Sequence, residues 1–431
     1  MLKSGSCDCA VNESCVQDQI LLVSPDSQPI VGNRLHWEHT IWGSHPKWVV
    51  EPCLDRIEQA ISPHIQQLWA SRCSRMTTQD IDIEFLAEGA FNKTYTATRA
   101  PCWHRQSYIV RISLPVDAYY KTVSEVATIK YLRAHTSIPI PEVFSWDASD
   151  QNPIGFEWIL MERVIGLPLQ EVWYPEHKVG SVGWHIKERT VELLADAVAQ
   201  MWRLRFPVGG SLYVADEVGV PGPVDVPGPA DVSGLVDNYQ TLPERIPVKV
   251  GREVSLEFFW EDHLHLTGIE RGPFSSSRPW LESRLRFVMA DAEKVMYHVQ
   301  GIDKGEMKQA ICMKEVAERL LHQLPNFIPM PLESTLPESF ALCHADFSGH
   351  NILVDHNGTL VSIIDWECTN ALPTWSACQV PDVIDSIDPR TEKPREEDYG
   401  DVALYLEDLE SYELAKLRRL FLARMSDIEP S

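Results

Sequence analysis

The sequence predicts an α+β fold of two lobes: a small N-terminal lobe built on an antiparallel sheet and a larger, mostly helical C-terminal lobe. Three observations support this prediction. Short strand-like segments joined by turns fill residues 81–113, and apolar residues at helical spacing dominate after residue 190. A short connector near Met161–Gly166 joins the two patterns.

An N-terminal extension is expected at residues 1–75, partly disordered and containing one helix. Residues 1–35 are polar and show no hydrophobic period, which is typical of poorly ordered chain. Residues 50–72 carry apolar side chains at helical spacing, which predicts an amphipathic helix before the first lobe.

The N-lobe is expected at residues 76–163. Alternating apolar and acidic residues from Ile81 to Phe85 predict its first strand, and a proline-rich stretch at Ser137–Pro141 ends its helix. Further strands are expected at Tyr95–Thr98, Ser107–Ser113 and Phe156–Met161, with the helix at about Val123–Ala134.

The C-lobe is expected at residues 164–431. Apolar stripes predict helices at residues 190–203, 279–295, 308–322 and 402–425. Two copies of Val-Pro-Gly-Pro lie at residues 220–234, where the density of Pro and Gly excludes a helix or a central strand and indicates a surface loop.

Composition limits the partners. The 431 residues contain 38 Lys and Arg against 62 Asp and Glu, a net charge of −24, which repels phosphate backbones and anionic lipid. We therefore expect no nucleic acid and no membrane as partner. Ten cysteines without a CxxC pair, and no recognisable targeting segment, favour a cytoplasmic protein with reduced thiols. The oligomeric state cannot be read from the sequence.

Residues 341–365 contain the strongest chemical signal. An apolar run leads into a polar segment with Asp346 and Asn351, and a predicted hairpin around Asn357-Gly358 returns the chain to Asp365. Two carboxylates and an amide at one mouth are oxygen ligands suited to Mg²⁺, with phosphates supplying the rest. The alternative is that Asp346 caps a turn and Asp365 ends a surface strand, but the spacing His-x-Asp-x₄-Asn favours the catalytic interpretation.

These segments resemble the aminoglycoside phosphotransferase family, in the fungal branch of the protein-kinase-like superfamily. The similar stretches cover about residues 80 to 375 in family order: Leu86–Tyr95, Tyr108–Ser113, Ser124–Thr128, Ser137–Glu142, Trp158–Glu162, Arg271–Phe274 and Ile364–Glu367, besides the segment around Asp346. The resemblance implies a two-lobed protein-kinase-like fold, ATP and Mg²⁺ as cofactors, and a small-molecule hydroxyl as acceptor.

Site residues follow from the same resemblance. Asp346 is expected to orient the acceptor hydroxyl and accept its proton, and Asn351 and Asp365 are expected to bind Mg²⁺. The residues implied to bind ATP are Glu88, Gly89, Ala90 and Lys93 in the turn over the phosphates, Arg111 with its partner Glu125, and Glu162 and Arg163 on the connector beside adenine.

The half of the candidate site that is expected to bind ATP departs from the family pattern. The turn keeps only Gly89 of the usual glycines, and Arg111 stands where kinases have a strand lysine, with Lys93 as a second candidate for the phosphate contact. An ordinary surface ion pair is the alternative for Arg111 and Glu125. Outside that half, His344 is expected to be structural, and Glu367 to form local hydrogen bonds.

The leading prediction is therefore an ATP-dependent O-phosphotransferase, a kinase with an alcohol group as acceptor. The alternative is a catalytically weak or inactive pseudokinase that acts as a nucleotide-binding or interaction protein. Trp366 after Asp365, and the absence of Ala-Pro-Glu downstream, argue against a protein kinase. Phe258–Asp262 and the acidic stretch Asp382–Asp401 are candidates to line the acceptor side, where an amine-bearing acceptor would suit the acids; a solvated acidic face is the alternative.

Overall fold

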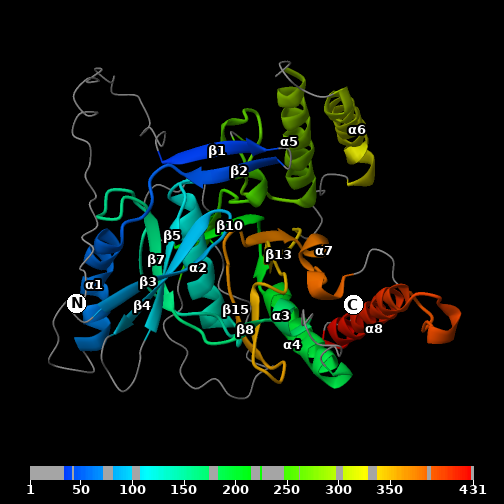
Figure 1. Cartoon of the computed structure of the whole chain (residues 1–431). Helices are drawn as coiled ribbons and strands as arrows, with labels where there is room; N and C mark the ends of the chain where they lie inside the picture. Colours follow the sequence, from blue (N-terminus) through cyan, green and yellow to red (C-terminus); the bar gives the residue numbers. More distant parts are fainter. Residues whose placement is uncertain are drawn as a thin grey trace.

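The computed structural model describes residues 34–40, 43–70, 81–99, 107–173, 183–214, 224–225, 247–261, 263–297, 304–328, 337–385 and 390–428. Disorder was expected for residues 1–35; residues 1–33 lie outside this range, as does most of the Pro/Gly loop at 220–234, whereas Leu35 begins a strand. Within the described chain, a strand-rich N-lobe and a larger C-lobe form the predicted two-lobed α+β fold (Figure 1).

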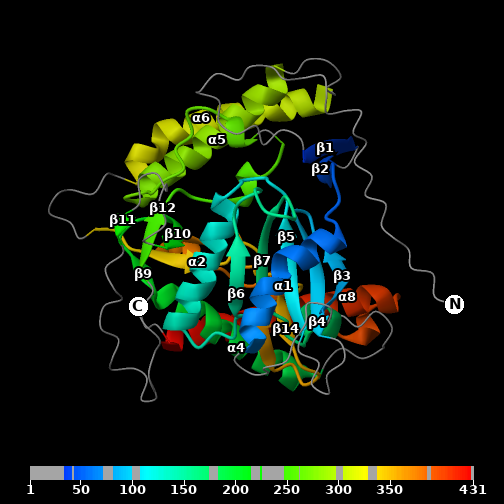
Figure 2. The ribbon, with the colours of Figure 1, turned by 90° about the vertical axis from the view of Figure 1, so that its left-hand side faces the viewer.

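The N-lobe is one antiparallel sheet in the order β3-β4-β5-β7-β6. Its strands are β3 (Ile81–Glu88), β4 (Asn92–Arg99), β5 (Ser107–Ser113), β6 (Val143–Asp147) and β7 (Glu157–Glu162). Helix α1 (Leu54–Ala70), predicted at 50–72, lies across one face of this sheet (Figure 2). Helix α2 (Tyr120–His135) contacts β6 and β7.

Alternation along β5 decides what each face of the sheet carries. Val110 and Ile112 are fully buried in the core shared with α1, whereas Arg111 between them points to the opposite face, where it meets α2. The apolar residues of β5 therefore anchor the sheet to α1, and its one central cation is left for the side that faces the C-lobe.

The sequence did not predict the hairpin of β1 (Leu35–Thr40) and β2 (Gly43–Trp48), which precedes α1. Its tryptophans Trp37 and Trp48 pack on a cluster that includes residues of both lobes. The hairpin therefore belongs to the folded body and is not merely a leading segment.

Among its described residues, the C-lobe contains the four predicted long helices and two sheets. Its helices are α3 (Leu169–Trp173), α4 (Trp184–Arg203), α5 (Ser277–Tyr297), α6 (Lys304–Phe327), α7 (Thr374–Ala377) and α8 (Val402–Ile428). The α5–α6 pair lies at one end of the molecule and α4 with α8 at the other in both views (Figures 1 and 2). No helix of the described residues has the length and hydropathy needed to cross a membrane.

The larger C-lobe sheet has the order β11-β12-β10-β16-β13-β9 and was not predicted. Its strands are β9 (Arg205–Phe206), β10 (Gly210–Val214), β11 (Val224–Asp225), β12 (Val248–Gly251), β13 (Phe340–Cys343) and β16 (Asn370–Pro373). Of the Pro/Gly loop, only β11 is described, and it is an edge strand, in agreement with the prediction that no central strand forms there.

The smaller C-lobe sheet has the order β15-β14-β8. It consists of β8 (Leu167–Pro168), β14 (Ile352–Val354) and β15 (Leu360–Ile363). The predicted hairpin is confirmed: Gly358 has a φ of 71°, and its amide donates to Asp355 O at 3.0 Å. This hairpin returns the chain to Asp365.

Candidate active site

The loop after β13 holds Asp346 and Asn351 against each other. All four residues of β13 are buried, which fixes the start of the loop in the C-lobe core. Asn351 Nδ2 donates to Asp346 Oδ2 at 2.8 Å and to Asp346 O at 3.0 Å. The Asp346 side chain remains exposed, so its carboxylate is oriented but still accessible to a ligand.

His344 supports this loop from beneath. It is buried, with Nδ1 accepting from Asp346 N at 3.2 Å and Nε2 donating to Ile364 O at 3.1 Å. These partners assign the tautomer. Burial lowers the pKa of His344 to about 4, so the ring is neutral near pH 7 and links the two chain segments that carry Asp346 and Asp365.

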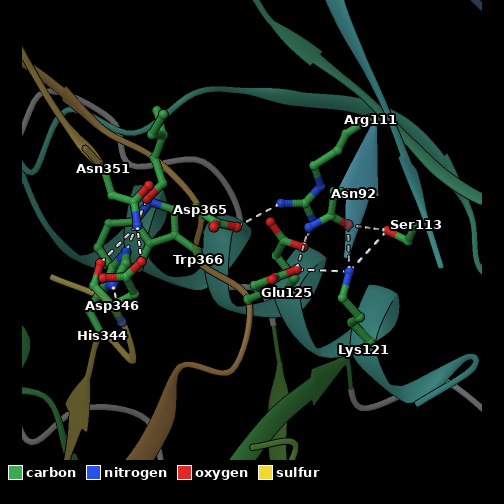
Figure 3. A network of polar contacts seen from close by, with 12 residues as sticks. Asn92, Arg111, Ser113, Lys121, Glu125, His344, Asp346, Asn351, Asp365 and Trp366 are labelled. Atoms are coloured by element: carbon green, nitrogen blue, oxygen red, sulfur yellow. Dashed lines mark hydrogen bonds and ion pairs between the residues drawn. The ribbon is translucent and has the colours of Figure 1, made fainter. Parts of the chain in front are cut away.

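Asp365 follows β15 with a backbone φ of 62°. A left-handed conformation is unfavourable for a residue with a Cβ, although aspartate tolerates it better than most. Neighbouring bonds hold it: Ile364 N donates to Asn351 O at 2.9 Å, and Trp366 Nε1 donates to Ile363 O at 2.9 Å. The turn places Asp365 Oδ1 3.0 Å from Arg111 Nη1 (Figure 3).

Arg111 bridges two carboxylates. Its guanidinium donates to Glu125 of α2 through Nη2 and to Asp365 through Nη1 (Figure 3). Arg111 is 7% exposed and Glu125 1%, so this is a buried pair, and the alternative of a surface ion pair is wrong. Asp365 is only partly buried, but the desolvation of its carboxyl and then the nearby charge of Glu367 raise its pKa to about 7, even though Arg111 acts to lower it.

A second cationic centre beside Arg111 was not identified from the sequence. Lys121 Nζ lies 2.7 Å from Asn92 Oδ1, 3.1 Å from Ser113 Oγ and 2.8 Å from Glu367 Oε2. Burial alone would raise the pKa of Glu367, but Lys121 and then Arg111 lower it to about 2. Glu367 was expected to bond locally, yet its partners Asn92 and Lys121 belong to the N-lobe. No local pattern marks such a pairing.

The turn between β3 and β4 is closed by its own backbone. Gly89 N donates to Asn92 O at 2.9 Å, and Glu88, Gly89 and Ala90 are exposed. Phe91, the next residue, is 4% exposed and packs edge-on against Phe259. The C-lobe thus fixes one side of the turn expected to cover the phosphates.

Lys93 is not brought to this site. It pairs with Ile112 across the sheet, which places it on the face opposite Arg111. Its ammonium forms ion pairs with Glu51 and with Glu88, and it lies 5.2 Å from the centre of the Trp48 ring. The structure therefore leaves Arg111, and not Lys93, beside Asp365.

The connector residues lie three strand pairs from Arg111, since Tyr108 pairs with Glu162 and Arg111 with Ile159. Glu162 N donates to Glu142 O at 2.8 Å, so this amide is already used. Arg163 Nη1 lies 3.5 Å from Ser107 Oγ.

The two stretches proposed for the acceptor side differ. Phe258 and Phe259 are buried in the protein core, and Asp262 lies outside the described residues. Most of Asp382 is exposed to solvent. The limited desolvation of its carboxyl and then the charge of Asp346 raise its pKa. Of these stretches, the one beginning at Asp382 is therefore electrostatically coupled to the catalytic loop. Residues 386–389 of this stretch are not described.

The donor set fits Mg²⁺ bound together with phosphates. Within the described part of the chain, no group of three or more His, Cys, Asp or Glu side chains forms a metal cage. Asn351 and Asp365 provide hard oxygen donors on adjoining segments, and Mg²⁺ commonly takes few protein ligands when phosphates supply the others.

A sequence model described as the phosphotransferase enzyme family matches residues 82–373. The chain belongs to this family. The match contains every candidate site residue except those beyond residue 373, so the geometry above is that of a phosphotransferase family member.

Curated relatives are distant. One is the subtelomeric hrmA-associated cluster protein of Aspergillus fumigatus, 28% identical over 332 residues, which cover 70% of this chain and 60% of the relative. Another is the altered inheritance of mitochondria protein 9, mitochondrial, of Eremothecium gossypii, 23% identical over 290 residues, with 62% and 45% covered. The chain thus spans 60% or less of the length of these relatives.

Solved structures with a similar course of chain include choline kinase from Cryptosporidium parvum, at 13% identity and a TM-score of 0.39, covering 87% of this chain and 88% of that one. The macrolide 2'-phosphotransferase from Brachybacterium faecium has 12% identity and a TM-score of 0.33, covering 85% and 98%.

Proposed function

We propose that the protein transfers the γ-phosphoryl group of ATP to a hydroxyl of a small molecule. The observation that carries this proposal is the joining of two half-sites. The Arg111–Glu125 pair of the N-lobe contacts Asp365, and the preceding residue, Ile364, donates its amide to Asn351 O in the Asp346–Asn351 pair of the C-lobe. Family membership supports the phosphotransferase chemistry.

Asp346 is the proposed catalytic residue. Asn351 holds one carboxylate oxygen, and His344 holds the Asp346 backbone, so the side chain presents its remaining acceptor capacity in a fixed direction. It would align the acceptor hydroxyl and accept its proton as the phosphoryl group is transferred. Such positioning supplies most of the rate in phosphoryl transfer.

Arg111, Asn351 and Asp365 are the proposed contacts to the metal and phosphates. When bound, Mg²⁺ supplies charge neutralisation on the β- and γ-phosphates, with Asn351 and Asp365 as its protein ligands. The Arg111 guanidinium, held by Glu125, is available to phosphate oxygens beside Asp365. Glu88, Gly89 and Ala90 would cover the phosphates, and the connector at Glu162 and Arg163 would border adenine.

The proposed acceptor carries an amine near its reactive hydroxyl. The negative charge of Asp346 raises the pKa of Asp382, which supports this idea because a cationic amine would be attracted by both carboxylates. We also propose a cytoplasmic location, because the ten cysteines of the sequence include no CxxC pair and most lie in apolar runs. Cell fractionation tests this, since one group of relatives is named mitochondrial.

ATP loss in a screen of pooled metabolites tests the function. The wild type is expected to consume ATP with one pool, whereas Asp346→Asn and Asp365→Asn lose at least 100-fold in rate. Asp196→Asn, a surface change, is the matched control and should retain activity. Full activity in Asp365→Asn would refute the assignment. A Mg²⁺-dependent thermal shift with ATP but no turnover in any pool would favour the pseudokinase.

A further inference from the structure

Lys121 is a charged side chain with almost no contact with solvent. It is 1% exposed and is among the largest fully buried side chains of the described chain. Lysine is seldom buried without partners, because removing the ammonium from water is costly. All three donors of Lys121 are matched here, by Asn92, Ser113 and Glu367.

These partners connect two parts of the proposed site. Asn92 accepts from Gly89 through its backbone carbonyl at 2.9 Å and so closes the turn over the phosphates. Asn92 Nδ2 also donates to Glu367 Oε2 at 2.9 Å, the same oxygen that Lys121 contacts at 2.8 Å. Glu367 lies two residues after Asp365. One carboxylate oxygen therefore joins the nucleotide turn to the metal-binding segment.

Direct contact of these residues with a ligand does not fit the geometry. The Lys121 ammonium has no donor left for a phosphate, and Glu367 is only 7% exposed. Arg111 differs, because it reaches Asp365, whose side chain is 34% exposed. The role of Lys121 must therefore be exerted through the residues that it holds.

We propose that Lys121, Asn92 and Glu367 form an interlobe pin that sets the spacing between the phosphate turn and Asp365, with Lys121 as a positioning residue. The inference rests on the proposed function, since the spacing matters for Mg²⁺ and ATP bound together. Loss of the pin lets Asp365 and the turn move independently. Mg²⁺ then no longer strengthens ATP binding, while Arg111 still contacts phosphate.

The test compares ATP affinity with and without Mg²⁺ by calorimetry in Lys121→Met, Glu367→Leu and the double variant. Each single variant leaves one buried charge unpaired and should be destabilised. The double variant should regain most of the stability, because replacing both members of a buried ion pair by apolar groups is often neutral or stabilising. In all three, the enhancement of ATP affinity by Mg²⁺ is expected to fall at least tenfold.

Lys187→Met is the matched control. Lys187 is 4% exposed and pairs with Glu413 Oε2 at 3.2 Å between α4 and α8, away from the proposed site. This variant should lose stability and retain the Mg²⁺ enhancement. The proposal is overturned if the double variant recovers the enhancement along with its stability, since the pin would then be structural only. It is also overturned if Lys121→Met strengthens Mg²⁺ dependence, which would make Glu367 a metal ligand.

Hydrogen exchange without nucleotide separates this inference from the proposed function. Lys121→Met and Asn92→Ala should each speed exchange at both residues 88–92 and residues 364–368, and Lys187→Met at neither. Unchanged exchange refutes the pin whatever the protein binds. If the variants speed exchange in both segments while the wild type binds no Mg²⁺–ATP, the pin is retained and the proposed function is refuted.

Discussion

Replacing His344 by Gln should remove a defined part of the acid sensitivity of the fold. Burial lowers the pKa of this histidine from 6.5 to about 4. The unfolded chain binds the proton below pH 6.5 and the folded chain only below about pH 4, so the free energy of unfolding falls as the pH falls through this window and is unaffected by this group above it. Across the whole window, the free energy of unfolding falls by about 3 kcal/mol, at roughly 1.4 kcal/mol per pH unit.

The assay is urea denaturation of wild type and His344→Gln at several pH values between 7.5 and 4.5. Gln keeps a donor for Ile364 O but takes up no proton, so the difference in stability between the two proteins should shift by about 2.5 kcal/mol in favour of the variant at pH 4.5. His356→Gln, a change at an exposed histidine in the turn between β14 and β15, should follow the wild type. Parallel curves for wild type and His344→Gln would refute a neutral, buried histidine.

Three further substitutions test the packing around the site. Arg111→Met leaves the buried Glu125 carboxylate unpaired and should cost about 3–5 kcal/mol, against less than about 1 kcal/mol for the exposed pair lost in Arg424→Met; equal losses in urea denaturation would contradict this. Burial raises the pKa of Glu157 to about 7, so its contribution to stability is present at acid pH and lost as the pH rises through 7. Glu157→Gln should therefore raise the melting temperature relative to wild type at pH 8 but not at pH 4, and an equal gain at both would argue against this. Phe91→Ala removes a buried ring, so it should lower the free energy of unfolding by about 3 kcal/mol and weaken ATP binding. Unchanged ATP affinity would show that the ring does not hold the phosphate turn.

Local patterns predicted the parts of the structure that local physics determines. The alternation at Ile81–Phe85 and the tight turn at Asn357-Gly358 each need only neighbouring residues, and both appear as predicted, in β3 and in the β14–β15 hairpin. The proximity of Asp346 and Asn351 follows in the same way, because they lie only five positions apart in one loop.

Features that depend on long-range pairing were not predictable. Asn92 and Glu367 are 275 residues apart, and nothing near either one signals the other. Strands β9 and β11 have two residues each, too few to show a period. Lys93 was proposed for phosphate because it is close to the turn in sequence, but one residue of register on β4 is enough to place it on the α1 face.

The low glycine content of the phosphate turn is a weak argument for an inactive protein. Glycines serve there by allowing a close backbone approach and unusual conformations. In this chain Gly89 and Ala90 leave the exposed part of the turn without large side chains, whereas Phe91 is held by the C-lobe and Asn92 by Lys121 and Glu367. Tertiary contacts thus fix the turn where a glycine-rich loop would be mobile, which reduces the ordering cost of binding. The choice between enzyme and pseudokinase therefore depends on turnover at Asp346, and not on the count of glycines.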